Sequence, residues 1–116
     1  MTKLPFFSVV IPTYNRAKNL KTALQQILKQ DFKNFEVIIS DNASTDNTEA
    51  IVKSFIDKRI KYFSNKKNIG VMPNVSKSIS LAEGKYIFLH GDDDFIINES
   101  ALSKLNDIIL RTKVGY

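Results

Sequence analysis

The chain of 116 residues is 43% hydrophobic and 25% charged, which is typical of one globular domain and excludes a disordered or membrane-spanning chain. It contains no cysteine, which excludes disulfides and thiolate chemistry and favours a reducing cytoplasm as its setting. Its net charge of +5 favours anionic partners, but the lysines are scattered rather than interleaved with aromatic residues, so we do not expect nucleic acid to be one of them.

Four short apolar runs predict β-strands, because each is rich in β-branched and aromatic residues and is bounded by polar clusters. The first, second and fourth are almost continuously apolar, which is typical of parallel strands that are covered on both faces. The runs are "FSVVIP" (7–12), "FEVIIS" (35–40), "IKYFS" (60–64) and "KYIFLH" (85–90).

The segments after these runs carry apolar residues at helical spacing. The first two helical stripes cover residues 17–28 and 51–56. A third helix is expected to start near Pro73, which suits a first helical position, and to stop at Gly84, where a left-handed cap costs little. A fourth is expected from about Asn98.

The resulting order, βαβαβαβα, predicts an α/β domain with an open, mostly parallel, Rossmann-like sheet. In such a sheet, ligands bind at the carboxyl ends of the strands. All the chemically distinctive stretches fall at this edge of the predicted sheet. They are "PTYNR" (12–16), "SDNAST" (40–45), "SNKKNIG" (64–70) and "HGDDDF" (90–95).

The three consecutive acids after the fourth run are candidates for a metal site. In an extended chain, Asp92 and Asp94 point to the same side, roughly 6.5–7 Å apart. Such a carboxylate pair suits Mg²⁺ or Mn²⁺ held against a diphosphate. The alternative is a solvent-exposed Gly-Asp turn that ends the strand. His90 is expected to be packed or hydrogen-bonded rather than to bind a metal.

Two other strand ends suit a nucleotide base. The carboxylate of Asp41 accepts hydrogen bonds only, so it fits an N–H of uracil or guanine, although it can equally form a turn or cap. Tyr14 can stack on a base, with Thr13 hydrogen-bonding to it. The alternative for this stretch is a generic loop with Asn15 as the N-cap of the following helix. Lys66 and Lys67 place cations near the third strand end.

Together and in this order, these stretches resemble the start of the family 2 glycosyltransferases, which have the GT-A fold. The resemblance covers the chain from about residue 7 to residue 114. It rests on an N-terminal "PTYNR", an Asp-x-x-Ser/Thr-x-Asp run after the second strand and an Asp-x-Asp after the fourth. The stretches are "SVVIPTYNR", "FEVIISDNASTDNT", "NIGVMPN" and "AEGKYIFLHGDDD".

The resemblance implies a role for each residue at the strand ends. Asp41 would accept the base N–H, and Asp94, together with Asp92, would hold Mn²⁺ or Mg²⁺ bridging the two phosphates. Either Asp92 or Asp93 would contact the ribose, because this chain has Gly91 where family members often have an acid. The remaining expected nucleotide-binding residues are Pro12, Thr13 and Tyr14 at the base, with Asn68 and Gly70 near the nucleotide.

The resemblance also implies the reaction: metal-dependent, inverting transfer of a sugar from a nucleotide-diphosphate sugar to an acceptor hydroxyl. UDP is the favoured nucleotide, and GDP remains open. The acceptor, whether glycan, lipid-linked or protein, also remains open, and so does peripheral association of the full-length protein with the inner face of the membrane. Such enzymes take part in polysaccharide and cell-envelope biosynthesis.

In the family, the acceptor pocket and the general base lie further along the chain, so we expect the base beyond Tyr116. Residues 1–116 are then the donor-binding half of a longer protein, inactive alone and able to self-associate through an open sheet edge. Three alternatives remain: a non-catalytic nucleotide-sugar-binding domain, a nucleotidyltransferase-like module and a receiver-like module. The last two would need a Gly-rich loop or acids, respectively, after the first strand, and "PTYNR" has neither.

Overall fold

The computed structural model describes residues 4–91 and 101–112. Strands and helices alternate along the chain, as the sequence predicts. The elements are β1 (Phe7–Thr13), α1 (Ala17–Leu28), β2 (Phe35–Asp41), α2 (Thr48–Lys53), β3 (Ile60–Ser64), α3 (Val71–Ser80), β4 (Tyr86–Leu89) and α4 (Ala101–Thr112).

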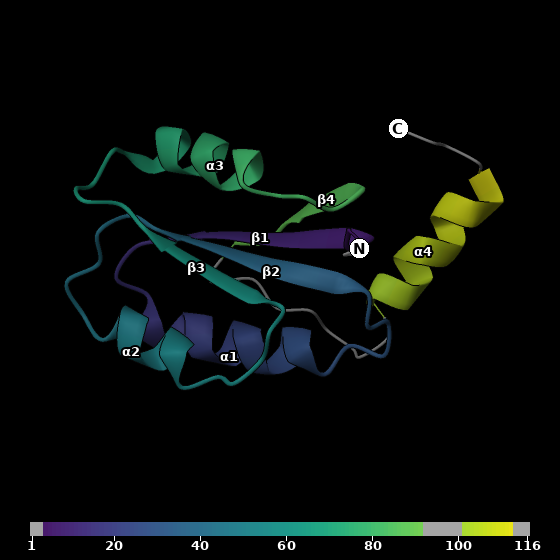
Figure 1. Cartoon of the computed structure of the whole chain (residues 1–116), viewed down its shortest axis with the longest axis horizontal. Coiled ribbons are helices and arrows are strands. Elements are labelled where there is room, and N and C mark those ends of the chain that lie inside the picture. Colours follow the sequence, from purple (N-terminus) through teal and green to yellow (C-terminus); the bar gives the residue numbers. More distant parts are fainter. Residues whose placement is uncertain (1–3, 92–100, 113–116) are drawn as a thin grey trace.

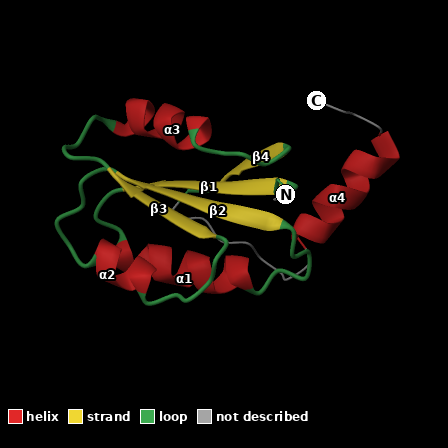
Figure 2. Cartoon of the chain, viewed as in Figure 1, coloured by secondary structure: helices red, strands yellow, loops and turns green. Residues whose placement is uncertain are grey.

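The four strands form one sheet in the order β3-β2-β1-β4, and every neighbouring pair is parallel (Figure 2). The first strand is central: Phe7 pairs with Phe35 on one side and with Tyr86 on the other. The prediction of an open parallel α/β sheet is confirmed. All four carboxyl ends therefore point to one edge of the sheet.

Helices cover both faces of the sheet, with α1 and α2 on one side and α3 on the other (Figure 1). This explains why β1 and β2 are almost continuously apolar. Leu20, Leu24 and Ile27 of α1 are completely buried against the sheet. Burying each such side chain contributes about 1.5–3 kcal/mol relative to exposing it.

The last helix, α4, lies beside the amino ends of the strands (Figure 1). Its Leu102 is fully buried and joins the core. The backbone N–H of Leu102 donates to Oε1 of the buried Gln30 at 3.1 Å, so a side chain that follows α1 satisfies a donor at the start of α4.

Two predicted helix ends are wrong. The third helix begins at Val71, close to Pro73 as expected, but it ends at Ser80 rather than at Gly84. Proline is accepted here because residues in the first turn need no intrahelical N–H partner. The second helix covers Thr48–Lys53, so Ile56 lies outside it and is completely exposed.

Gly84 is required by a close approach of backbones rather than by a helix cap. A Cβ at this position would lie 2.5 Å from Oγ of Ser8 and 2.8 Å from the carbonyl carbon of Phe7. Real Cβ atoms essentially never come this close to their neighbours, so any larger residue would displace the strand beside it.

A buried carboxylate joins the amino ends of the strands. Glu36 accepts hydrogen bonds from Oγ of Ser8 (2.5 Å), Nζ of Lys61 (2.9 Å) and the backbone N–H of Glu83 (2.7 Å). The Ser8 hydroxyl oxygen in turn accepts the N–H of Gly84 at 2.7 Å. Burial raises the pKa of Glu36, but these donors outweigh it and hold the pKa below the ordinary value. We call these five residues the amino-end network.

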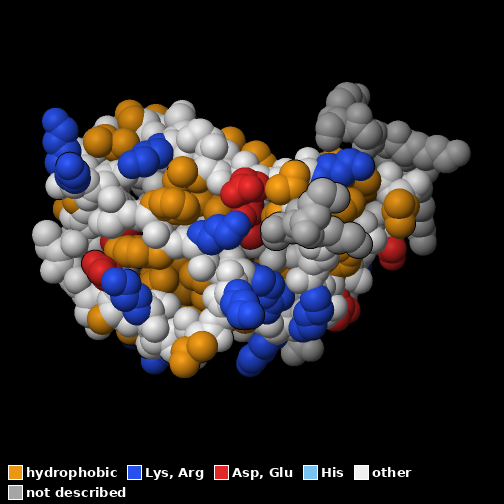
Figure 3. All heavy atoms as spheres, viewed as in Figure 1, with side chains coloured by type: hydrophobic (Ala, Val, Ile, Leu, Met, Phe, Trp, Pro, Cys, Tyr) orange, Lys and Arg blue, Asp and Glu red, His pale blue; other side chains and the backbone are white. Residues whose placement is uncertain are grey.

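Within the described residues, β4 pairs with β1 only, so its other edge is open. Ile87 and Leu89 on this strand are 46% and 50% exposed. None of the helices in these ranges is long and apolar enough to cross a membrane. Lys and Arg side chains are spread over most of the face shown in Figure 3.

Candidate functional site

The loops after β1 and β2 are joined by Asn15, which takes a left-handed conformation with φ 50°. Its Oδ1 accepts the backbone N–H groups of Thr45 (2.7 Å) and Asp46 (3.3 Å), and its own N–H donates to Oγ of Ser44 (2.9 Å). The alternative in which Asn15 is an N-cap is therefore wrong. Arg16 occupies the cap position of α1 and makes no side-chain cap bond.

Asp46 provides the missing cap from the neighbouring loop. Its Oδ2 accepts the N–H of Ala17 at the start of α1 (3.2 Å), while its Oδ1 accepts the N–H of Thr48 (3.0 Å) at the start of α2. Burial raises the pKa of Asp46, but hydrogen bonds from Thr48 and from the backbone outweigh it and lower the pKa overall. One carboxylate thus fixes two helices beside the carboxyl edge of the sheet.

Asp41 ends β2 and is only 2% exposed. Its Oδ1 accepts the N–H (3.0 Å) and the hydroxyl (2.5 Å) of Ser44, which closes a turn. Its Oδ2 accepts the hydroxyl of Tyr62 at 2.5 Å. Burial and this carboxylate together raise the pKa of Tyr62, so the phenol keeps its proton. Because a carboxylate oxygen has two lone pairs, Oδ2 retains capacity for a further donor.

Asn42, next along the chain, uses its whole side-chain amide within the structure. Its Nδ2 donates to Oδ1 of Asn68 (2.9 Å) and to the carbonyl oxygen of Gly70 (3.2 Å). Its Oδ1 accepts the N–H of Ile69 (2.9 Å) and an N–H of Asn65 (3.0 Å). Asn42 is buried and fixes the loop between β3 and α3 against the end of β2.

Two further buried amides continue this arrangement. Nδ2 of Asn65 also donates to Oδ1 of Asn74 at 3.0 Å, and its Oδ1 accepts from Nζ of Lys77 at 2.5 Å. Asn74 exchanges two hydrogen bonds with Ser40, at 2.8 and 2.9 Å. We call Asn42, Asn65 and Asn74 the amide network. No sequence signal marks this network, because asparagines near strand ends look the same as turn and cap residues.

The predicted residues Asn68 and Gly70 lie in the loop that Asn42 holds. Gly70 has φ 93° and ψ 161°, a conformation open essentially to glycine alone, and it directly precedes α3. Its N–H donates to Oδ1 of Asn68 at 2.8 Å. The two residues therefore shape the turn into α3.

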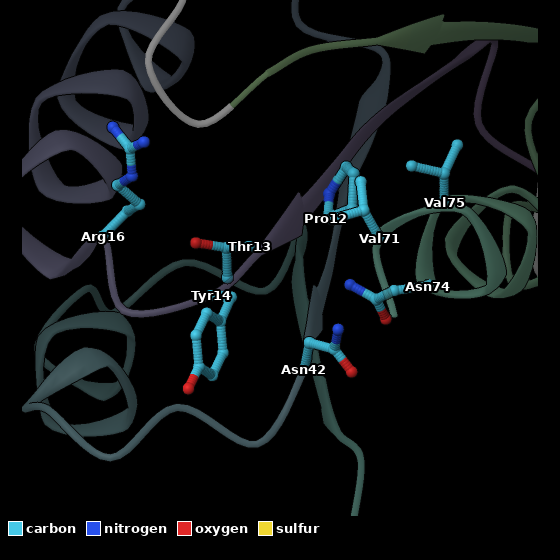
Figure 4. A pocket seen from close by; sticks show the side chains of 8 residues that line it. All are labelled: Pro12, Thr13, Tyr14, Arg16, Asn42, Val71, Asn74 and Val75. Carbon is cyan, nitrogen blue, oxygen red and sulfur yellow. The ribbon is translucent and has the colours of Figure 1, made fainter. Parts of the chain in front are cut away.

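A pocket of about 370 Å³ opens between the end of β1 and the start of α3 (Figure 4). This volume is within the range of small-molecule sites. Figure 4 shows Tyr14 and Arg16 on the β1 side and Val71, Asn74 and Val75 on α3. The lining residues are Pro12, Thr13, Tyr14, Arg16, Asn42, Val71, Asn74 and Val75.

The predicted base-binding residues Pro12, Thr13 and Tyr14 all line this pocket. Tyr14 is 44% exposed, so its ring remains accessible to a ligand. Arg16 was not predicted as a site residue, although it belongs to the "PTYNR" stretch. The structure therefore brings the first predicted strand end together with the amide network at one cavity.

The proposed metal ligands Asp92 and Asp94, and Asp93 between them, lie outside the described residues. Within residues 4–91 and 101–112, no group of three or more His, Cys, Asp or Glu side chains is arranged to hold a metal ion. His90 is packed and hydrogen-bonded, as expected: it is 2% exposed and its Nδ1–H donates to the carbonyl oxygen of Gly91 at 2.6 Å.

The comparisons with known protein families, proteins and structures agree on one family. Residues 8–115 match the sequence model described as glycosyl transferase family 2. The chain is 41% identical to the GalNAc(5)-diNAcBac-PP-undecaprenol beta-1,3-glucosyltransferase of Campylobacter jejuni, over 97% of this chain and 36% of that protein.

Two solved structures share the fold. S. aureus TarS 1–349 in complex with UDP has a TM-score of 0.82 and 34% identity, covering 90% of this chain and 32% of that one. The mannosyltransferase PcManGT of Pyrobaculum calidifontis, in complex with GDP-Man and Mn²⁺, has a TM-score of 0.81 at 24% identity, covering 93% and 33%. The chain thus spans about a third of the length of these relatives.

Proposed function

Because the chain belongs to glycosyl transferase family 2, we propose that its pocket binds the nucleoside diphosphate of a sugar donor, with UDP as the favoured nucleotide. The observation that carries the proposal is the position of the pocket. It opens at the carboxyl end of β1, beside the start of α3, where an open parallel sheet binds its ligands. The UDP bound to the related TarS supports this choice of nucleotide.

The first strand end supports the base in this proposal. Tyr14 stacks on the ring with its exposed face, while Pro12 and Thr13 line the pocket beside it. Asp41 accepts the base N–H with the remaining capacity of Oδ2, which Tyr62 orients. Asn68 and Gly70 bring the β3–α3 loop close to the nucleotide.

The diphosphate is assigned to the acids that follow β4. We propose that Asp92 or Asp93 contacts the ribose, and that Asp94 and Asp92 hold Mn²⁺ or Mg²⁺. When bound, such an ion is a Lewis acid that stabilises charge on a departing diphosphate. The contribution of the described residues is to hold the donor in one orientation against this end of the sheet, which lowers the entropic part of the barrier.

The whole protein is proposed to transfer the sugar with inversion to an acceptor hydroxyl, with a general base outside residues 1–116. The name of the Campylobacter relative includes a diphosphoundecaprenol-linked saccharide, which supports a lipid-linked acceptor. A lipid-linked acceptor places the reaction beside a membrane surface. The absence of cysteine fits the cytoplasmic side of that membrane.

The test is a calorimetric titration of the chain with UDP, with and without Mn²⁺, and with GDP in parallel. We expect Tyr14→Ala to lower UDP affinity roughly 5- to 150-fold, because stacking of one base on an aromatic ring is worth about 1–3 kcal/mol. Asp94→Ala should remove the Mn²⁺ dependence. The control is Ile56→Ala, which shortens an exposed apolar side chain that does not line the pocket. A chain that binds neither nucleotide, or a Tyr14→Ala variant that binds UDP normally, would refute the proposal.

A further inference from the structure

We propose that Asn65 is a positioning residue for the donor site, although it does not line the pocket. It acts through Asn42 and Asn74, which do. This inference rests on the proposed function, because the pocket that it concerns is the proposed donor site. No motif of the sequence analysis includes this role.

The geometry makes Asn65 the centre of the amide network. It is 7% exposed and directly follows β3. One N–H of its side chain donates to Oδ1 of Asn42 and the other to Oδ1 of Asn74, both at 3.0 Å. A single planar group thus joins an amide at the end of β2 to an amide on α3, and Figure 4 shows both of those amides beside the pocket.

The direction of these bonds matters more than their number. Asn65 and the backbone N–H of Ile69 both present hydrogens to Oδ1 of Asn42. Asn42 therefore turns this oxygen toward them and its Nδ2 toward Asn68 and Gly70. An oxygen at position 65 would instead repel Oδ1 of Asn42, and only a rotation of Asn42 by half a turn would relieve that repulsion. Its own oxygen would then face two acceptors, Oδ1 of Asn68 and the carbonyl oxygen of Gly70, which repel it.

Replacing the donors of Asn65 by an oxygen would also affect Asn74 on α3. Oδ1 of Asn74 accepts from both Asn65 and the hydroxyl of Ser40, so an oxygen at position 65 would face an oxygen there as well. Asn65 therefore acts on the pocket wall on two sides, together with Ile69 at Asn42 and Ser40 at Asn74. Its own orientation is fixed by Lys77, whose Nζ donates to its Oδ1.

Asn65→Asp tests this polarity with a small change in shape. The carboxylate keeps an acceptor for Lys77 and replaces both donors by acceptors. The N–H groups of Ile69 and Gly70, which are bonded to Asn42 and Asn68 in the native chain, should then exchange with solvent faster. This readout needs no ligand. Asn65→Ala is the second variant, since it removes both donors without adding a charge.

The matched control is Ser8→Ala, which breaks buried hydrogen bonds of the amino-end network and leaves the pocket untouched. We expect both Asn65 variants to bind UDP in the presence of Mn²⁺ roughly 2- to 30-fold more weakly at temperatures where they are folded. Ser8→Ala should lose thermal stability but bind within about twofold of the native chain and leave exchange at Ile69 and Gly70 unchanged.

Three outcomes overturn the inference. Normal exchange at Ile69 and Gly70 in both Asn65 variants would show that Asn65 does not position the loop. Faster exchange with normal UDP affinity would show that the loop position does not govern the pocket. An equal loss of affinity in Ser8→Ala would show a general effect of stability. A native chain that binds neither UDP nor GDP would refute the proposed function itself, whatever the exchange experiment shows.

Discussion

At the amino ends of the strands, one carboxylate is surrounded by donors of the same chain, whereas at the carboxyl ends three neutral amides hold loops around an open pocket. Glu36 has donors on both oxygens and does not line the pocket at the carboxyl ends, although Glu83 and Gly84 of the same network line a second pocket. Asn42 and Asn74 are as deeply buried, but they also form the wall of a cavity of about 370 Å³.

The difference shows how buried polar groups can serve two purposes in one sheet. The carboxylate at the amino end bonds only to groups of the chain and does not line the pocket at the carboxyl ends, so we expect it to stabilise the fold. The amides at the carboxyl end fix the shape of a surface that faces solvent. We therefore expect changes at the amino end to alter stability alone, and changes at the carboxyl end to alter ligand affinity as well.

The largest effect is expected from Gly84→Ala in the amino-end network. The new methyl group would overlap the backbone of Ser8 and Phe7, so the free energy of unfolding should fall by about 3 kcal/mol or more. Urea unfolding measures this loss. UDP affinity, measured on the folded fraction, should stay unchanged; a weaker affinity would mean that the two ends of the sheet are coupled.

The next largest effect is expected from Asp41→Asn at the carboxyl end. The amide keeps an oxygen for Ser44 but can present its NH₂ to the base N–H, where only an acceptor fits. An unpaired buried donor costs about 1–3 kcal/mol, so UDP affinity should fall roughly 5- to 150-fold. Calorimetry with UDP and GDP measures it. Unaltered affinity with an intact fold would leave Asp41 as a turn residue only.

A smaller effect is expected in the pH dependence of stability, to which Glu36 at the amino end should contribute. The pKa of Glu36 is held below its ordinary value of 4.5, so its contribution to stability is complete above about pH 4.5 and is lost as the pH falls through the lowered pKa. In Glu36→Gln the drop in thermal stability on acidification should be shallower than in the native chain. Identical acid profiles in the two proteins would contradict the role of this carboxylate.

The smallest effect is expected from Ile56→Lys, which belongs to neither end and provides the baseline. This side chain is completely exposed, so stability should change by no more than about 0.5 kcal/mol. UDP affinity should not change. A destabilisation larger than that of Glu36→Gln at neutral pH would contradict the expectation that Ile56 contributes no packing to the fold.

The fold was predictable because its signals are local. The buried strands β1 and β2 are almost continuously apolar, and α1 shows a clear apolar stripe. The errors arose where local signals are ambiguous. Ile56 continued the stripe of α2 beyond its end, and Gly84 looked like a helix cap although its small size is needed by a neighbouring strand.

The residues of the candidate site were predictable from the sequence only where consecutive residues at one strand end line the pocket. Pro12, Thr13 and Tyr14 follow one another and line the pocket. The amide network joins residues far apart in the sequence: the pairs Asn42–Asn65 and Ser40–Asn74 are separated by 23 and 34 positions. No local pattern marks such pairs, and only the sheet order brings them together.

The central position of β1 has a consequence for synthesis on the ribosome. It is made before the other three strands described here; β2 can pair with it as soon as it emerges, and β3 can then pair with β2. Its other edge, Phe7–Val10, waits until residues 86–89 are translated. Until then the nascent chain presents one edge of a strand that is almost wholly buried in the folded protein as an unpaired template for other chains. Because this pairing is long-range in sequence, we expect it to be a slow step of folding, so a variant that delays β4 should lower the yield of soluble protein more than its native-state stability indicates.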